Sequence, residues 1–323
     1  MNTDQLLNEL ETNQLLSLDQ RSRIEEYNRH KPVSLYGYIR VALYLSITSI
    51  IGGLGVLIYE NINTAGHIVL LLVLSLLTLG SFLFVFRQGL PYSSARVDHQ
   101  NPYLDTVLLL GCLLFLVVEG YAQYQFQVFG TRYGVATLLP ALLFLFLAYR
   151  FDHQGVLSLG LSSLASWIGL TVTPNELLVK NDFTDISVLI TALVFGGTVT
   201  LLSKILAIRN IKSHFNYTYL LIAGTLFLAA STAGMITFDS WKFVFSILSG
   251  VGCWYFYVNA RLGESLLFLL IGLVFGYITV TYLLFSQLSL EFGAFFGSLY
   301  FLLSAAGVVW FLLNFKKLLG KTV

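Results

Sequence analysis

The sequence predicts an all-α integral membrane protein, a polytopic transmembrane helical bundle of about ten spans with a short N-terminal cytosolic helical pair. Composition is the first observation behind this prediction. Of the 323 residues, 56% are hydrophobic and only 11% are charged, whereas soluble domains carry roughly 25% charged residues. Mean hydropathy, at +0.78, is the second. The third is that the apolar residues form runs of about 20, the length that crosses a bilayer core of about 30 Å.

Ten such runs follow one another and divide the chain into three parts. They cover residues 39–59, 66–86, 104–123, 133–149, 155–172, 186–208, 217–238, 241–258, 264–285 and 292–314. The fourth and fifth are short and are joined by "RFDHQG", so partly buried helices are the alternative for these two. We therefore expect a cytosolic N-terminal helical segment at 1–38, a transmembrane bundle at 39–314 and a short basic cytosolic tail at 315–323.

The distribution of Lys and Arg predicts the orientation, because cytoplasmic loops are enriched in these residues. With the N-terminus in the cytosol, only Arg132, Lys180 and Lys242 fall outside, and the other 15 of the 18 basic residues fall inside. A span missed or added in mid-chain would move every later loop to the opposite side. The asymmetry therefore predicts a multi-pass protein with both termini cytoplasmic and the lipid bilayer as its solvent.

The N-terminal segment alternates apolar and charged residues at helical spacing, which predicts two short helices. Ser17 and Gln20 form a capping-box pattern at the start of the second helix, and Pro32 ends it. One small apolar seam would be formed by Leu6, Leu7, Leu10, Leu15, Leu16 and Ile24. This seam could pack on itself as a cap, lie on the membrane surface or dock a protein partner.

The sequence contains few signs of catalysis. Cys112 and Cys253 stand alone in apolar runs, without the CxxC spacing of metal or redox sites. The five histidines are scattered and form no HExxH motif. The net charge is +1 and the basic residues are dispersed, so no phosphate-tracking surface for nucleic acid is predicted. We expect no metal, no cofactor, no nucleic-acid partner and no enzymatic activity.

One polar stretch interrupts this pattern at the extracytoplasmic end of the third run. Glu119, Gln123 and Gln127 are spaced i, i+4 and i+8, which places them on one face of a helix that leaves the membrane. Arg132 follows across a short loop as a counter-charge. A carboxylate within a span suggests a ligand or proton site. The alternatives are a glutamate hydrogen-bonded at headgroup level and a helix that ends at "YQFQVF" in the aromatic belt.

Two glycine pairs predict close helix contacts near the C-terminus. Gly272 and Gly276, and then Gly293 and Gly297, have the GxxxG spacing that lets helix backbones approach closely in lipid. We predict packing within the bundle, with dimerisation as the alternative.

Two stretches of the sequence resemble a known family. They are "LLNELETNQLLSLDQRSRIEEY" and the span region in which Gln123 and Tyr124 close one helix, Pro140 interrupts the next and Trp167 ends the third. This combination resembles the domain of unknown function 2157 family, bacterial predicted polytopic membrane proteins. The resemblance implies a helical fold in a bacterial cytoplasmic membrane and implies no activity.

For function, the sequence favours a non-enzymatic membrane protein with a structural, regulatory or partner-binding role. The N-terminal helices are its possible docking segment for a protein partner. A permease for a small or lipid-like solute is the alternative, suggested by the span count and by the polar end of the third run.

Overall fold

The computed structural model describes residues 20–21, 23, 36–61, 64–97, 102–130, 132–172, 183–286 and 290–319. Most of the predicted N-terminal helical pair, including its apolar seam, lies outside these residues. Every regular element among the described residues is helical, which confirms the all-α prediction. The long helices are α3 (Tyr36–Asn61), α4 (Thr64–Gln88), α5 (Pro102–Phe126), α6 (Tyr133–Phe151), α7 (Gln154–Val172), α8 (Ile186–Ile208), α10 (Thr225–Thr237), α11 (Lys242–Leu262), α12 (Leu266–Phe285) and α13 (Leu290–Leu318).

The helices have the lengths that a polytopic membrane protein requires. Within the described residues, nine helical stretches are long and apolar enough to cross a membrane, including the two short helices α6 and α7. The predicted first run is helix α3, in which the described apolar part is the shorter stretch Val41–Gly53. The seventh run is a continuous helical stretch built from α9 (Asn216–Tyr219), the π-helix η3 (Leu220–Gly224) and α10.

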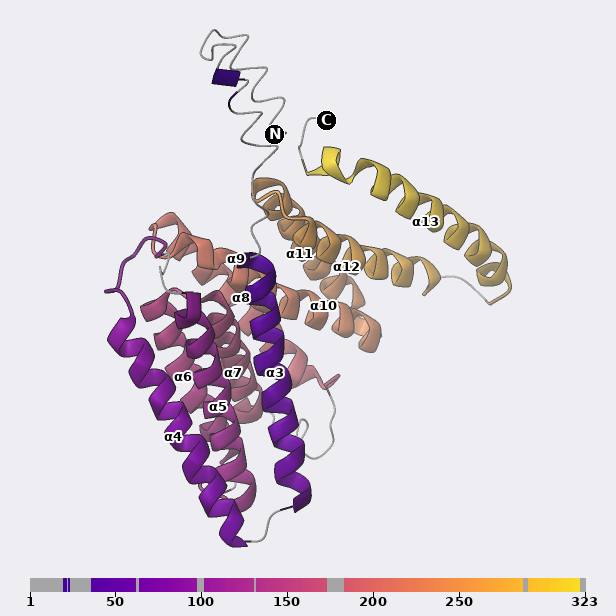
Figure 1. The fold of residues 1–323 in the computed structure, drawn as a ribbon. Helices are drawn as coiled ribbons and strands as arrows, with labels where there is room; N and C mark the ends of the chain where they lie inside the picture. Colours follow the sequence, from indigo (N-terminus) through magenta and orange to yellow (C-terminus); the bar gives the residue numbers. More distant parts are fainter. Residues whose placement is uncertain are drawn as a thin grey trace.

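The helices form two groups (Figure 1). In the N-terminal helix group, α3 to α7, helix α5 packs on α3 and α4, and α6 packs on α7. In the C-terminal helix group, α8 to α13, helix α10 packs on α8 and α11, and α11 packs on α12. Helices α7 and α8 contact each other and join the two groups.

The two larger apolar clusters of the described residues stabilise these groups. The larger one is centred on fully buried side chains such as Phe144 and Leu157 of the N-terminal helix group, and it also includes Phe195 and Val199 of α8. The smaller one lies within the C-terminal helix group around Leu228 and Phe256. Because the larger cluster contains residues of both groups, the two groups share one core.

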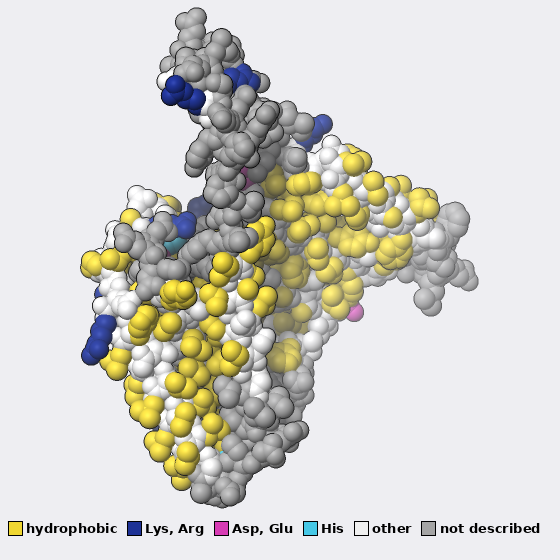
Figure 2. Space-filling model, in the orientation of Figure 1, with side chains coloured by type: hydrophobic (Ala, Val, Ile, Leu, Met, Phe, Trp, Pro, Cys, Tyr) yellow, Lys and Arg dark blue, Asp and Glu magenta, His cyan; other side chains and the backbone are white. Residues whose placement is uncertain are grey.

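The outer faces of the helices are apolar as well. Large hydrophobic side chains on α4, α8, α11 and α13 are exposed, among them Leu76, Leu201, Trp254 and Leu313. Figure 2 shows hydrophobic side chains over both helix groups with few charged ones between them. A helix that is apolar on all sides is stable only when lipid or protein surrounds it, so these faces are lipid-facing surfaces.

Helix α13 lies against α12 through a row of polar aromatic contacts. The Thr281 and Tyr300 hydroxyl oxygens are 2.6 Å apart. The Tyr277 hydroxyl donates to Ser304 Oγ over 3.3 Å, and the rings of Tyr277 and Tyr300 are stacked. In lipid, where no water satisfies these hydroxyl groups, such hydrogen bonds favour helix association.

Candidate functional site

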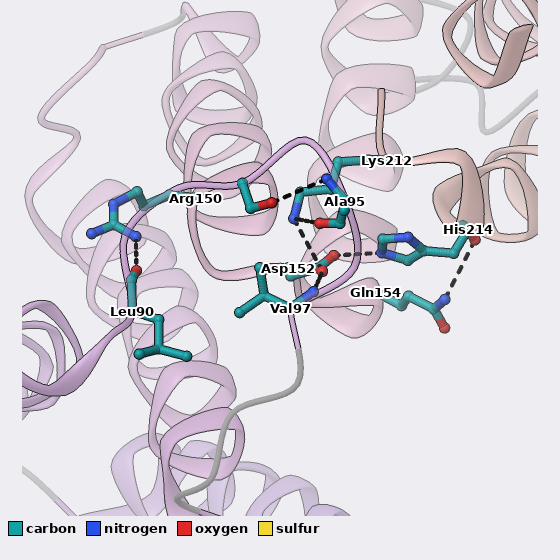
Figure 3. Close-up of polar contacts among 9 residues, drawn as sticks. Leu90, Ala95, Val97, Arg150, Asp152, Gln154, Lys212 and His214 are labelled. Atoms are coloured by element: carbon teal, nitrogen blue, oxygen red, sulfur yellow. Dashed lines mark hydrogen bonds and ion pairs between the residues drawn. The ribbon is translucent and has the colours of Figure 1, made fainter. Parts of the chain in front are cut away.

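The main polar cluster of the described chain lies where three connections meet at one end of the bundle. We call it the Asp152 cluster and define it as Asp152, His153, Lys212 and His214. Figure 3 shows Asp152, Lys212 and His214 with their polar contacts. Asp152 and His153 form the turn between α6 and α7, whereas Lys212 and His214 lie beyond the end of α8. The third connection is the segment after α4, which contributes backbone groups. In the predicted orientation, all three connections are cytosolic.

The tight turn between α6 and α7 places the Asp152 carboxylate. Asp152 caps the C-terminus of α6 in the left-handed conformation, at φ 57°, and its backbone N–H donates to the Ala148 carbonyl. Aspartate tolerates this conformation better than most residues because its short side chain can form local hydrogen bonds. The chain therefore reverses between α6 and α7, with the carboxylate turned toward the neighbouring connections.

Three donors surround the Asp152 carboxylate. Its Oδ2 accepts a hydrogen bond from the Val97 backbone N–H at 2.5 Å and forms an ion pair with Lys212 Nζ at 3.0 Å. Its Oδ1 lies 2.5 Å from His214 Nε2. Only 1% of the Asp152 side chain and none of the Lys212 side chain is exposed, so this is a buried ion pair.

Lys212 is held in place by hydrogen bonds from both its backbone and its side chain. Its backbone has φ 47°, in the left-handed region, and its backbone N–H donates to the Ser94 carbonyl at 2.8 Å. The ammonium group also donates to the Ala95 carbonyl at 3.1 Å and lies 5.7 Å from the centre of the Tyr92 ring. The segment after α4 is thereby attached to the connection that follows α8.

The electrostatics of the cluster favour the charged form of Asp152. Burial raises the pKa of the Asp152 carboxyl, but hydrogen bonds from the Val97 N–H, Lys212 and His214 outweigh burial and hold the pKa below its ordinary value. The carboxylate is therefore ionised at neutral pH. Removing one partner of such a buried pair costs several kcal/mol, because the other charge is left unpaired.

His153 connects the cluster to α3. Its Nδ1 accepts a hydrogen bond from the Val156 backbone N–H at 3.0 Å, so in the neutral imidazole Nε2 carries the proton. Nε2 lies 3.1 Å from the Tyr44 hydroxyl of α3. Nearby, the Arg150 guanidinium donates to the Leu90 carbonyl (Figure 3). The cluster thus connects the start of α3, the segment after α4, the α6–α7 turn and the end of α8.

At the opposite end of α5, the structure separates the four polar residues that the sequence predicts as a site. Glu119 and Gln123 lie one turn apart on α5, and both are buried, with exposed fractions of 9% and 8%. Helix α5 ends at Phe126, and Gln127 has a positive φ of 48°. The predicted helical face therefore stops at Gln123, and the interpretation in which the helix ends within "YQFQVF" agrees with the structure.

Gln123 closes the end of α5. Its Nε2 donates to the Gly130 carbonyl at 2.8 Å, and its Oε1 accepts from the Phe129 backbone N–H at 2.9 Å. Arg132 is the exposed N-cap residue of α6, and the described residues contain no ion pair between it and Glu119. Glu119 Oε1 is buried and has no hydrogen-bond partner within the described part of the chain. Gln123 is thus a structural group here, and of the four predicted residues Glu119 is the one with an unpartnered buried oxygen among the described residues.

The predicted packing glycines lie along α12 and α13. A Cβ atom at Gly272 would lie 3.2 Å from the Cys253 carbonyl oxygen of α11, and one at Gly276 would lie 3.7 Å from Cys253 Sγ. At Gly297 it would lie 3.4 Å from the Phe285 ring. Gly293 lies outside the residues whose side-chain surroundings are described.

The sequence analysis missed the Asp152 cluster. Asp152 and Lys212 are 60 positions apart, and neither belongs to a recognisable motif. One signal was available, because the polar connections "RFDHQG" and "RNIKSHFN" are predicted on the same side of the membrane. Their proximity follows from the packing of α7 on α8 and on α9.

The fold and the polar clusters together define a multi-pass α-helical membrane protein. Residues 8–157 match the family described as predicted membrane protein (DUF2157), which confirms the resemblance predicted from the sequence. The matched part includes Glu119 and Asp152 and ends before Lys212. No curated protein and no solved structure matches the chain.

Proposed function

We propose that this chain is a non-enzymatic protein of a bacterial cytoplasmic membrane that binds a protein partner at its cytosolic face. In this proposal both termini are cytoplasmic, the helical bundle anchors the complex, and the N-terminal segment, predicted from the sequence to be helical, contacts the partner. The distribution of Lys and Arg supports the orientation. The proposal assigns the protein a structural or regulatory role.

The observation that supports this proposal best is that the polar groups of the Asp152 cluster bond to one another and to the protein backbone. The Asp152 carboxylate accepts a hydrogen bond from the Val97 N–H and contacts the charged or polar side chains of Lys212 and His214, so all its partners come from the protein itself. A catalytic or transport site needs polar groups that can reach a substrate. The cluster instead fixes three connections to one another, which favours a rigid platform over an open site.

The contact between Tyr44 and His153 relates this platform to the docking segment. Helix α3 begins at Tyr36, two turns before Tyr44, and the N-terminal segment leads directly into it. The hydrogen bond between His153 Nε2 and the Tyr44 hydroxyl holds this end of α3 against the cluster. A partner bound to the N-terminal helices would therefore be held close to the platform.

Association in native membranes tests the proposal. The full chain is crosslinked in cells, extracted in mild detergent and sized on native gels. We expect the wild type in a discrete complex with another protein, and the chain lacking residues 1–31 as a free monomer that is still inserted in the membrane.

Replacing Leu6, Leu7 and Leu10 with serine should have the same effect as the deletion. The matched control, Asn8→Ser with Asn13→Ser, should keep the complex. A complex that survives the deletion contradicts the proposal.

A permease for a small or lipid-like solute is the second candidate, and Glu119 favours it. This carboxylate is buried within α5 and has one oxygen without a partner, and ionisable groups inside membrane spans often mark transport pathways. Cysteine accessibility separates the two candidates. Phe115→Cys and Glu119→Cys are each treated in intact cells with a membrane-impermeant thiol reagent, in a chain lacking Cys112 and Cys253. Reaction at both positions supports a water-filled vestibule, whereas no reaction at Phe115→Cys supports the platform.

A further inference from the structure

A cavity of about 260 Å³ lies between helices of the C-terminal helix group, at the half of the bundle where α8 ends. Its wall is almost entirely apolar and includes Gly197 of α8, Gly224 of η3, Phe227 of α10 and Gly252 of α11. Leu201 and Val251 also line it, with exposed fractions of 66% and 60%, so the cavity opens onto the lipid-facing surface. Its volume is close to the lower end of ligand pockets, about 300 Å³.

The shape of this cavity follows from the local helix geometry. The π-helix η3 inserts one wide turn into the helix that faces α8 and α11, and such turns often occur at functional sites. Glycines on three helices leave the cavity without side chains at those points. A Cβ at Gly224 or Gly252 would approach Leu220 or Leu228 to 2.6 Å, whereas a Cβ at Gly197 would meet nothing nearer than 3.7 Å. Gly197 is therefore the position at which a side chain can fill the cavity.

A lysine lies beside this apolar wall. Lys204 follows Thr200 and Leu201 of the wall by one turn on α8, and its Nζ lies 5.7 Å from the centre of the Tyr255 ring, which also lines the cavity. No carboxylate of the described residues pairs with Lys204. The residue is exposed and lies four positions before the end of α8, about 6 Å along the axis. A lysine at this depth can extend its ammonium group to the lipid headgroups.

We propose that this cavity binds one acyl chain of an anionic phospholipid whose phosphate headgroup contacts Lys204. The apolar wall accommodates the hydrocarbon, and the unpaired ammonium group at its end supplies the charge that selects an anionic headgroup. Basic residues beside pockets between transmembrane helices bind anionic lipids in this way. In the predicted orientation, the lipid comes from the cytosolic leaflet.

Native mass spectrometry of the purified full-length protein tests this proposal. The protein is released from detergent micelles that contain equal amounts of dioleoyl phosphatidylglycerol and dioleoyl phosphatidylcholine. We expect a one-to-one adduct dominated by phosphatidylglycerol. Gly197→Phe should abolish this adduct, whereas Gly250→Phe should keep it, because Gly250 is exposed on α11 and has open space around it. Equal lipid binding by these two variants would overturn the assignment of the cavity.

A second pair of variants tests the headgroup contact. Lys204→Gln should lower the preference for phosphatidylglycerol over phosphatidylcholine about fivefold, the effect of one basic residue near an anionic headgroup. Lys317→Gln, at another exposed lysine near the end of α13, should leave the preference unchanged. If the preference survives in Lys204→Gln, the proposed contact is wrong. Because Lys204 is exposed, this pair remains informative even if Gly197→Phe fails to fold.

This inference does not depend on the proposed protein partner. Loss of the complex on deletion of residues 1–31 and loss of the lipid adduct in Gly197→Phe are separate observations. A lipid adduct in a chain that forms no protein complex would support the cavity and contradict the platform. The opposite result would support the platform alone.

Discussion

Two buried carboxylates at opposite ends of the N-terminal helix group differ in their surroundings. Asp152 lies in a turn and has Lys212, His214 and the Val97 N–H around it. Glu119 lies on a helix near the other end of the bundle, and its Oε1 has no hydrogen-bond partner among the residues that the structure describes. Both side chains are thus buried, but only Asp152 of the two has charged partners among the described residues.

This difference shows where the bundle uses charge for stability. A buried charge is tolerated when fixed partners compensate for lost hydration, and for Asp152 the main partner comes from the distant C-terminal helix group. The ion pair thus joins the two helix groups, whereas the described residues contain no ion pair of Glu119. The two sites should respond very differently to substitution and to pH.

Asp152→Ala should produce the largest effect. It leaves the Lys212 ammonium group buried without its carboxylate, so we expect the free energy of unfolding to fall by about 3–5 kcal/mol. Unfolding in mixed detergent micelles measures this change. The control is Asp239→Ala, which removes an exposed carboxylate that pairs with Lys242 over 3.7 Å and should cost less than about 1 kcal/mol. Equal losses in the two variants would contradict the structural role of Asp152.

Acidification should also lower the free energy of unfolding through Asp152, but by less than Asp152→Ala does. The pKa of Asp152 is lower in the folded protein than its ordinary value, so the unfolded chain takes up the proton first as the pH falls. The stabilisation is therefore complete above about pH 4, the region of an unperturbed aspartate, and is lost at lower pH. Melting curves between pH 7 and pH 3 should show this loss in the wild type. In Asp152→Asn this component should be missing, and identical pH profiles would contradict the account.

Gln123→Leu should have an intermediate effect. The substitution removes the partners of the Phe129 N–H and the Gly130 carbonyl, and unsatisfied buried groups cost about 1–3 kcal/mol. Hydrogen exchange at the Phe129 amide should accelerate. Gln125→Leu, at an exposed position two residues further along α5, is the control and should leave this amide protected. Unchanged protection in Gln123→Leu would show that the side chain does not close the helix end.

Glu119→Gln should have the smallest effect. The amide keeps the shape of the side chain, and no ion pair within the described residues is lost. We expect a change in the free energy of unfolding of less than about 1 kcal/mol, with stabilisation favoured because the substitution removes the cost of a buried charge. The same assay as for Asp152→Ala measures it. A loss larger than about 2 kcal/mol would reveal a charged partner for Glu119.

The fold could be predicted closely from the sequence because the bilayer fixes the length of an apolar helix. The predicted run 186–208 has the same limits as α8, and the run 133–149 differs from α6 by two residues at one end. Lipid-facing and protein-facing side chains are both apolar, so the hydrophobic pattern indicated no neighbours for either helix.

Individual contacts were less predictable for the same reason. The spacing of Glu119, Gln123 and Gln127 suggested one face, but Gln123 hydrogen-bonds to the following loop and the helix ends before Gln127. The pair between Asp152 and Lys212 depends on how α7 packs against α8, a long-range contact that composition and periodicity do not contain. Polar residues in the connections therefore needed the structure before a partner could be assigned.

A double-mutant cycle between Asp152 and Lys212 tests the central claim most directly. The free energy of unfolding is measured for the wild type, Asp152→Asn, Lys212→Met and the double variant. If a buried ion pair joins the two helix groups, the double variant loses less stability than the single losses combined, with a coupling of about 2–3 kcal/mol. Additive losses, within about 0.5 kcal/mol, would show that the two side chains do not stabilise each other and would contradict the account.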